Sequence, residues 1–279
     1  MTDDQVRSAA PAGGKPTKID NSIAHPARVY DYLLGGKDNF APDRAAAERA
    51  YASYPGGLEG IRVHARAQRS FLSRAVHHLA GETGTRQFLD IGTGIPTADN
   101  THQVAQRVAP ESRVVYVDND PIVLVHARAL LVSSPEGRTD YIDADLRDPD
   151  AILSEAAATL DFTQPVAITL LGILHFFDDA DDPYGIVTRL LQAVPPGSHL
   201  VIAHLASDVL PVMTEALKTL SQRMSVPVCP RTQLEVARFF EGLEVLGPGV
   251  VQLHRWRPGA DDLAADVEVP VHCGVARKP

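Results

Sequence analysis

Three aspartates follow or end short apolar runs, where a parallel sheet would bring their carboxylates to one edge. They are Asp90 in the run 87–91, Asp118 after 113–117 and Asp145 after 140–142. A carboxylate accepts hydrogen bonds from ribose hydroxyls or an exocyclic amine, and it complements a cationic group. Open α/β sheets bind ligands outside the carboxyl ends of their strands. The three acids therefore indicate a site for a nucleoside ligand that carries positive charge.

A turn with two glycines follows Asp90 and leads into a predicted helix. Gly92 and Gly94 let a ligand approach the backbone where a Cβ would collide. A pyrophosphate-binding turn needs a third glycine and free amides, but Thr97 takes that position and Pro96 has no amide hydrogen. S-adenosylmethionine has no phosphate and bears a sulfonium and an ammonium. The turn therefore favours this cofactor over NAD, although a purely structural turn would use the same residues.

Two of the three acids also have a simpler interpretation. Asp118 could cap the helix that begins at Pro121, a role equally open to Asp120. Asp145 taken alone is more often a turn residue than a ligand contact. We interpret Asp118 as the ribose ligand and Asp145 as an acceptor for the adenine amine, with Leu146 as an apolar wall. Their positions at strand ends support this interpretation.

From residue 86 onward, short apolar runs alternate with helical stretches. Strands are predicted at 87–91, 113–117, 140–142, 166–171 and 199–203, with helices at 97–108, 121–131, 149–158 and 184–193 between them. Helices follow at 209–223 and 233–240, and closing strands near 245, at 250–256 and at 269–275, including an antiparallel pair. This alternation predicts a doubly wound, mostly parallel α/β sheet covered by helices on both faces.

The first 82 residues have a different pattern. Residues 1–18 are rich in Ala, Gly, Pro and charge without an apolar period, which predicts a disordered leader. Residues 19–82 form a predicted helical cap, with one helix from Pro26 to Leu34, a stop at Gly35-Gly36 and a longer amphipathic helix over 58–79. Residues 83–279 are the predicted core domain.

Composition limits the partners and the compartment. Against 26 basic residues stand 35 acidic ones, a formal charge of −9, which argues against nucleic acid and anionic membranes and favours a small molecule. The two cysteines, Cys229 and Cys273, form no metal or disulfide pattern, so no metal site is expected. Without a secretory signal or a long uncharged apolar run, the chain is expected to be soluble and cytoplasmic.

Several motifs resemble those of known methyltransferases. The segments DIGTG (90–94), VD (117–118) and AD (144–145) resemble the first three motifs of class I S-adenosylmethionine-dependent methyltransferases, and ILHFFDD (173–179) is similar to their segment after the fourth strand. The segment of residues 21–44 is a more specific sign of one family. From about residue 19 to the end, the chain resembles the actinobacterial S-adenosyl methyltransferase group 19 family, formerly a family of unknown function.

The resemblance implies a seven-stranded, Rossmann-like fold that binds S-adenosylmethionine and releases S-adenosylhomocysteine. It implies roles for ten core residues and His175: the methionine end is shaped by Asp90, Gly92, Thr93 and Gly94, the ribose is held by Asp118 and Asn119, the adenine by Asp145 and Leu146, and the cleft after the fourth strand is lined by Leu171, Gly172 and His175. One departure is His272-Cys273-Gly274-Val275, where the family usually has Tyr-Gly-Gly-Val.

The N-terminal segment 21–44 contains many polar side chains. Without the resemblance it would be interpreted as a capped helix with surface charges; with it, we predict a lid that closes over the cofactor and helps define the acceptor site. The lid residues are Arg28, Asp31, Gly36, Lys37 and Asn39, and the candidate catalytic residues are His25, Tyr30 and His175. An imidazole titrates near neutral pH. His175 could equally be a packed core histidine.

These observations predict methyl transfer to an oxygen or nitrogen of a small molecule by in-line displacement. The segment 169–172 lacks the Asn/Asp-Pro-Pro-aromatic run with which nucleic-acid amino-methyltransferases hold a flipped base. Two alternatives stay open at this point: a non-catalytic protein that senses S-adenosylmethionine, and an NAD-linked oxidoreductase. The acceptor is not specified by the sequence, and a homodimer is left open.

Overall fold

The computed structural model describes residues 20–279 except 131, 260–261 and 263–266, so the predicted leader lies outside the described residues. An eight-stranded sheet with the order β3-β2-β1-β4-β5-β8-β6 forms the centre, and β7 pairs with β8. The strands are β1 Gln87–Ile91, β2 Arg113–Asp118, β3 Arg138–Asp143, β4 Ala167–Leu171, β5 His199–Leu205, β6 Glu244–Val245, β7 Val251–Gln252 and β8 Val271–Arg277.

The first five strands are parallel, and β8 runs antiparallel to β5, β6 and β7. The strand order reverses beside β1, because β2 lies on one side of it and β4 on the other. In the register of β1 and β2, Ile91 lies opposite Val117, so the turn after β1 and Asp118 at the end of β2 reach the same edge. The predicted doubly wound, mostly parallel α/β fold is confirmed.

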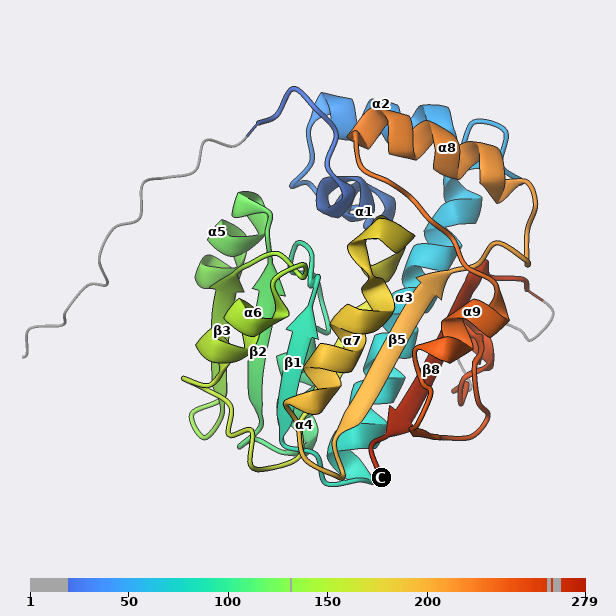
Figure 1. The fold of residues 1–279 in the computed structure, drawn as a ribbon. Helices are drawn as coiled ribbons and strands as arrows, with labels where there is room; N and C mark the ends of the chain where they lie inside the picture. The colour runs from blue at the N-terminus through green and yellow to red at the C-terminus, as the bar shows by residue number, and fades with distance from the viewer. Residues whose placement is uncertain (1–19, 131, 260–261, 263–266) are drawn as a thin grey trace, which may run out of the picture.

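Helices cover both faces of the sheet (Figure 1). Buried residues of α3 (Gly57–Gly81) and α4 (Thr101–Val108) pack against one set of strand side chains. Those of α6 (Pro149–Ala156), α7 (Pro183–Gln192) and α9 (Gln233–Arg238) pack against the opposite set. Helix α5 (Pro121–Leu130) follows β2. Alternate residues of the central strands thus enter two separate cores, as expected for a sheet buried on both sides.

A cap lies over the carboxyl ends of the parallel strands (Figure 1). It consists of α1 (Pro26–Leu34), α2 (Ala41–Ala50), the first turns of α3 and α8 (Met213–Met224), which share one buried apolar cluster. The cluster thus includes a helix from far beyond residue 82. Helix α3 belongs to both parts, because its later turns cover the sheet.

The bounds of α1 follow from its terminal residues. Pro26 occupies the first turn, where a missing amide hydrogen costs nothing, and His25 is the N-cap. Gly35 ends the helix with φ of 82°, a left-handed conformation that glycine adopts without strain. A Cβ on Gly36 would lie 1.9 Å from a carboxylate oxygen of Asp31, so only glycine fits beside that buried acid. The predicted helix from Pro26 to Leu34 is confirmed.

The predicted strand 250–256 is wrong beyond Gln252. The 3-10 turn η3 (Leu253–Arg255) follows β7 at once. Arg74 on α3 donates to the carbonyl oxygens of Leu253 (2.7 Å) and Trp256 (2.9 Å), and the Trp256 ring packs edge-on against Phe71, with ring centroids 5.5 Å apart. These tertiary contacts turn an apolar segment of strand-like composition toward α3 instead of extending the sheet.

The predicted helix 97–108 begins only at Thr101, because Asn100 caps it and its side chain also bonds Thr97. Residues 97–100 are instead a loop beside the strand ends. Within the described part of the chain, no helix combines the length and apolar character needed to cross a bilayer.

Candidate active site

A cavity of about 300 Å³ lies between the carboxyl ends of β1, β2 and β4 and the cap helices α1, α3 and α8. Among the predicted site residues, those that line it are His25, Tyr30, Asp90, Gly92, Thr93, Gly94, Asp118, Asn119, Leu171, Gly172 and His175. The lining does not include Asp145, Leu146 or the predicted lid residues Arg28, Asp31, Gly36, Lys37 and Asn39. The structure therefore gathers the strand-end residues with two cap residues around one space.

Asp90 is a buried carboxylate in the floor of this cavity. Thr101 of α4 donates to one carboxylate oxygen (2.6 Å), and Thr169 of β4 donates to the other (2.8 Å). Burial raises the pKa of Asp90, and the two threonine hydrogen bonds oppose that rise. Two neighbouring elements thus fix the orientation of the carboxylate, which can complement a cationic ligand group.

Asp118 ties the glycine turn to the end of β2. Its Oδ2 accepts from the amide of Gly94 (2.8 Å), and its Oδ1 accepts from the amide of Asp120 (3.0 Å). Burial raises the pKa of Asp118, with these backbone hydrogen bonds opposing the rise. The amide of Ile122 in α5 bonds Asp120 (2.9 Å), so Asp120 serves the start of that helix and Asp118 faces the cavity.

Asp145 reaches the rim of the cavity through two neighbours. It accepts from the side-chain amide of Asn119 (3.2 Å) and pairs with the guanidinium of Arg147 (3.3 Å), and both of these residues line the cavity. Leu146 is buried in the core beneath the sheet face that α6 covers. The segment 145–147 therefore borders the cavity, with Arg147 as a lining residue that sequence reasoning missed.

Arg69 on α3 is a second residue that sequence reasoning missed. It lines the cavity and donates to the carbonyl oxygens of Ala98 (2.9 Å) and Asp99 (2.8 Å), while its Nε is buried without a partner. Its positive charge opposes the burial-driven rise in the pKa of Asp90. A cation and an anion at one end of the cavity match the carboxylate and ammonium of a zwitterionic amino acid group.

The three candidate catalytic residues differ in how they are held. His25 Nδ1 lies 2.8 Å from a carboxylate oxygen of Asp120, which links the cap to the loop after β2. Tyr30 donates its hydroxyl to the carbonyl of Ala65 (3.1 Å), and burial raises its pKa to about 12. His175 is buried with no partner for Nδ1, and burial, followed by His204 and Arg231, sets its pKa well below 6.5.

The far half of the cavity is apolar. We call it the acceptor chamber and define it by six buried residues of α1, α3 and α8: Val29, Leu33, Ile61, Met213, Leu217 and Leu220. His64 of α3 also lines the cavity and contributes a polar side chain to its wall. The sequence signal for His64 was its helical spacing, because it precedes Gln68 and Leu72 by one and two turns on one helix face.

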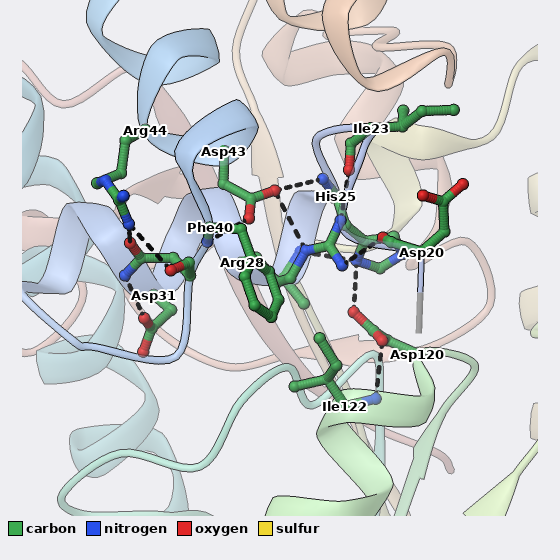
Figure 2. A network of polar contacts seen from close by, with 12 residues as sticks. Asp20, Ile23, His25, Arg28, Asp31, Phe40, Asp43, Arg44, Asp120 and Ile122 are labelled. Atoms are coloured by element: carbon green, nitrogen blue, oxygen red, sulfur yellow. Dashed lines mark hydrogen bonds and ion pairs between the residues drawn. The ribbon is translucent and has the colours of Figure 1, made fainter. Parts of the chain in front are cut away.

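Two of the predicted lid residues, Arg28 and Asp31, belong to a network of polar contacts inside the cap (Figure 2). Arg28 and Asp43 form a buried pair at 3.2 Å, with exposed fractions of 4% and 0%. Arg28 also donates to the carbonyl oxygens of Asp20 (2.9 Å) and Ile23 (2.5 Å). Asp43 accepts from the backbone amide of His25 (2.8 Å), so this pair fixes the residue that contacts the rim.

A second cluster closes the turn after α1. Asn39 donates to Asp31 (2.8 Å) and to the carbonyl of Gly36 (3.0 Å). Asp31 also accepts from the amide of Asp38 (3.0 Å), and burial raises its pKa. Lys37 is exposed at this turn. These residues therefore shape the cap from within, and the cavity wall itself comes from other cap residues.

The switch in strand order beside β1, the glycine turn and the acids at the carboxyl edge define a class I S-adenosylmethionine-dependent methyltransferase. The chain matches the model of the S-adenosyl methyltransferase family over residues 12–279 and belongs to that family. It is therefore an enzyme that uses S-adenosylmethionine. A search of curated proteins finds no match.

Solved structures agree with this assignment. A DUF574 family protein from Streptomyces avermitilis is 48% identical, with a TM-score of 0.89 over 94% of this chain and 100% of that chain. A candidate methyltransferase from Thermobifida fusca is 41% identical, with a TM-score of 0.83 over 93% of this chain and 96% of that chain. An O-methyltransferase family protein from Burkholderia thailandensis, 15% identical with a TM-score of 0.51 over 79% of this chain and 58% of that chain, shares the fold.

Proposed function

We propose that this enzyme transfers a methyl group to an oxygen or nitrogen of a small molecule bound in the acceptor chamber. The observation that carries the proposal is one continuous cavity with two unlike ends. Charged Asp90 and Arg69 line the end at the strands, and buried apolar residues line the end under the cap. Such a cavity holds a zwitterionic cofactor and an apolar acceptor side by side, where both lose contact with water.

The residues at the strand ends fit S-adenosylmethionine. The buried, unpartnered Nε of Arg69 is a donor for its carboxylate, and Asp90 complements its ammonium. Gly94 leaves open space where a Cβ would stand, and beside it Asp118 can accept from the ribose hydroxyls. Asn119 and Arg147, both bonded to Asp145, border the adenine. Leu171 and Gly172 line the cleft near the sulfonium.

When bound, S-adenosylmethionine would supply a methyl group activated by its sulfonium, which the acceptor would take in exchange for a proton, with S-adenosylhomocysteine as the other product. The protein has to align the acceptor and exclude water. His25 and His175 are the candidates to receive the proton, because both line the cavity. The Tyr30 hydroxyl already donates to Ala65, which suits a role in positioning α1 against α3.

The cap acts as the lid in this proposal. Its internal pairs, Arg28 with Asp43 and Asp31 with Asn39, keep α1 in the position where His25 and Tyr30 border the cavity. The net charge of −9 supports a small acceptor over a nucleic acid. We expect the reaction to take place in the cytoplasm.

Calorimetry with S-adenosylmethionine and S-adenosylhomocysteine tests the proposed cofactor site. Asp118→Ala should weaken both by about tenfold or more, since a buried charged acceptor is lost. Asp143→Ala is the matched control, because Asp143 ends the adjacent strand opposite Asp118 but is exposed. Turnover is then sought by screening cell extract with a labelled methyl donor. Equal loss in both variants, or tight binding of NADH instead, would contradict the proposal.

A further inference from the structure

The wall of the acceptor chamber includes His64, a histidine with one unpaired ring nitrogen. His64 is 8% exposed, and its Nε2 shares a hydrogen bond of 3.2 Å with the hydroxyl of Tyr54. Its Nδ1 is buried and has no partner. A buried polar atom without a partner is costly, and on a cavity wall it marks the place where a ligand group completes the bond.

The surroundings of His64 restrict the charge of that ligand. All six residues that define the chamber are uncharged and apolar, so an ionised group placed there would lose its hydration without compensation. Burial, with His254 as a lesser cause, lowers the pKa of His64 to about 4, so the imidazole is neutral near pH 7. A neutral imidazole nitrogen pairs with a hydroxyl or an amine and gives no charge to balance a carboxylate.

Helix geometry places His64 near the reacting end of the cavity. One turn further along α3, Gln68 donates to the carbonyl of Leu171 at the end of β4 (3.4 Å). Four residues of helix advance about 6 Å along its axis. A group held at His64 therefore lies one helical turn from the strand ends, where the cofactor binds.

Building on the proposed methyl transfer, we propose that the acceptor is an uncharged, mostly apolar molecule whose one hydroxyl or amine hydrogen-bonds to Nδ1 of His64. Tyr54 is the positioning residue in this arrangement, because its hydroxyl hydrogen-bonds to Nε2 of His64 and leaves Nδ1 for the acceptor. The bulk of the acceptor would lie against Met213, Leu217 and Leu220 of α8.

The test measures binding of four uncharged alcohols of increasing bulk to the protein loaded with S-adenosylhomocysteine: phenol, 1-naphthol, 4-phenylphenol and 1-adamantanol. The tightest alcohol is then compared with its parent hydrocarbon and its carboxylate analogue. We expect the alcohol to bind about fivefold more tightly than the hydrocarbon and at least tenfold more tightly than the carboxylate. Failure of all four alcohols to bind, or a carboxylate that binds as well, would overturn the proposal.

His64→Phe separates the hydrogen bond from simple filling of the chamber. This variant keeps a ring but removes Nδ1, so it should lose about fivefold in affinity for the alcohol and bind the hydrocarbon as before. His77→Phe, at an exposed position of the same helix, should change neither value. Equal preference for the alcohol in wild type and His64→Phe would refute the role of His64.

Binding of S-adenosylhomocysteine is measured first for every protein, which distinguishes two kinds of failure. If the wild type does not bind it, the proposed function fails. If the wild type binds it and the alcohol results are negative, only the assignment of the chamber fails. Loss of S-adenosylhomocysteine binding in His64→Phe alone would show that His64 belongs to the cofactor site and would also overturn the inference.

Discussion

The two ends of the cavity are built in opposite ways. At the strand ends, Asp90 and Asp118 each accept two hydrogen bonds from the protein, so their orientation is set before any ligand arrives. In the acceptor chamber, the six defining side chains are apolar, and Nδ1 of the neighbouring His64 lacks a partner. The difference suggests a fixed site for a constant cofactor beside a wall that a particular acceptor completes.

A buried ion pair in the cap supports the chamber. Breaking this pair should lower the free energy of unfolding more than any other change proposed here. Asp43→Ala leaves Arg28 buried without its partner and removes the acceptor for the His25 amide. We expect the free energy of unfolding to fall by about 3–5 kcal/mol, as measured by urea titration. Asp38→Ala, at a partly exposed position of the same cap, should change it by less than about 1 kcal/mol. Similar losses in both variants would mean that the buried pair does not support the cap.

Substitutions at the strand end of the cavity should lower ligand affinity more than they lower the free energy of unfolding. Arg69→Ala removes the only lining cation that α3 contributes in the described chain, so binding of S-adenosylhomocysteine should weaken by about 2–3 kcal/mol in calorimetry. Arg66→Ala, exposed three residues earlier, is the control and should bind normally. Normal binding by Arg69→Ala would show that this arginine does not contact the cofactor. The strand end of the cavity would then lack its proposed cationic contact.

The contrast also explains what could be predicted from sequence. The rim residues and the bounds of α1 were predictable, because a strand end, a glycine turn or a proline cap is specified by residues close together in the chain. The chamber was not, because α8 joins α1 only in the folded chain, 179 positions after Leu34. Arg69 was missed for the same reason: its partners are the carbonyls of Ala98 and Asp99.

The wrong prediction of a strand over 250–256 shows where local sequence signals mislead. Its composition favours a strand, and nothing local indicates the contacts with Arg74 and Phe71 that bend it after Gln252. Local signals thus predicted the parallel strands and the helices between them, but not α2 (Ala41–Ala50) in the cap. They could not predict how helices distant in the sequence would meet, and the acceptor chamber depends on those meetings.

Acid should affect the chamber through His64. Because burial lowers its pKa to about 4 from a usual value near 6.5, the unfolded chain binds more protons than the folded chain between these values. Stability from this group is therefore complete above about pH 6.5 and is lost as the pH falls toward 4. On lowering the pH from 7 to 5, wild type should lose about 2 kcal/mol more than His64→Phe in urea unfolding. His77→Phe should follow the wild type, and identical losses in all three proteins would place His64 in contact with water.

The smallest change in the free energy of unfolding is expected at the contact between the cap and the loop after β2. His25→Ala removes the 2.8 Å contact with Asp120 and the N-cap of α1, whereas His25→Asn keeps a side chain that can cap the helix. Because the His25 side chain is 35% exposed, we expect each variant to lose less than about 1 kcal/mol of unfolding free energy. Amide exchange of Val29, which bonds the His25 carbonyl, should speed up in both variants if the contact holds the cap closed, and only in His25→Ala if capping alone does so. The second result would mean that the contact between His25 and Asp120 does not hold the cap closed. The cap would then open independently of the strand ends.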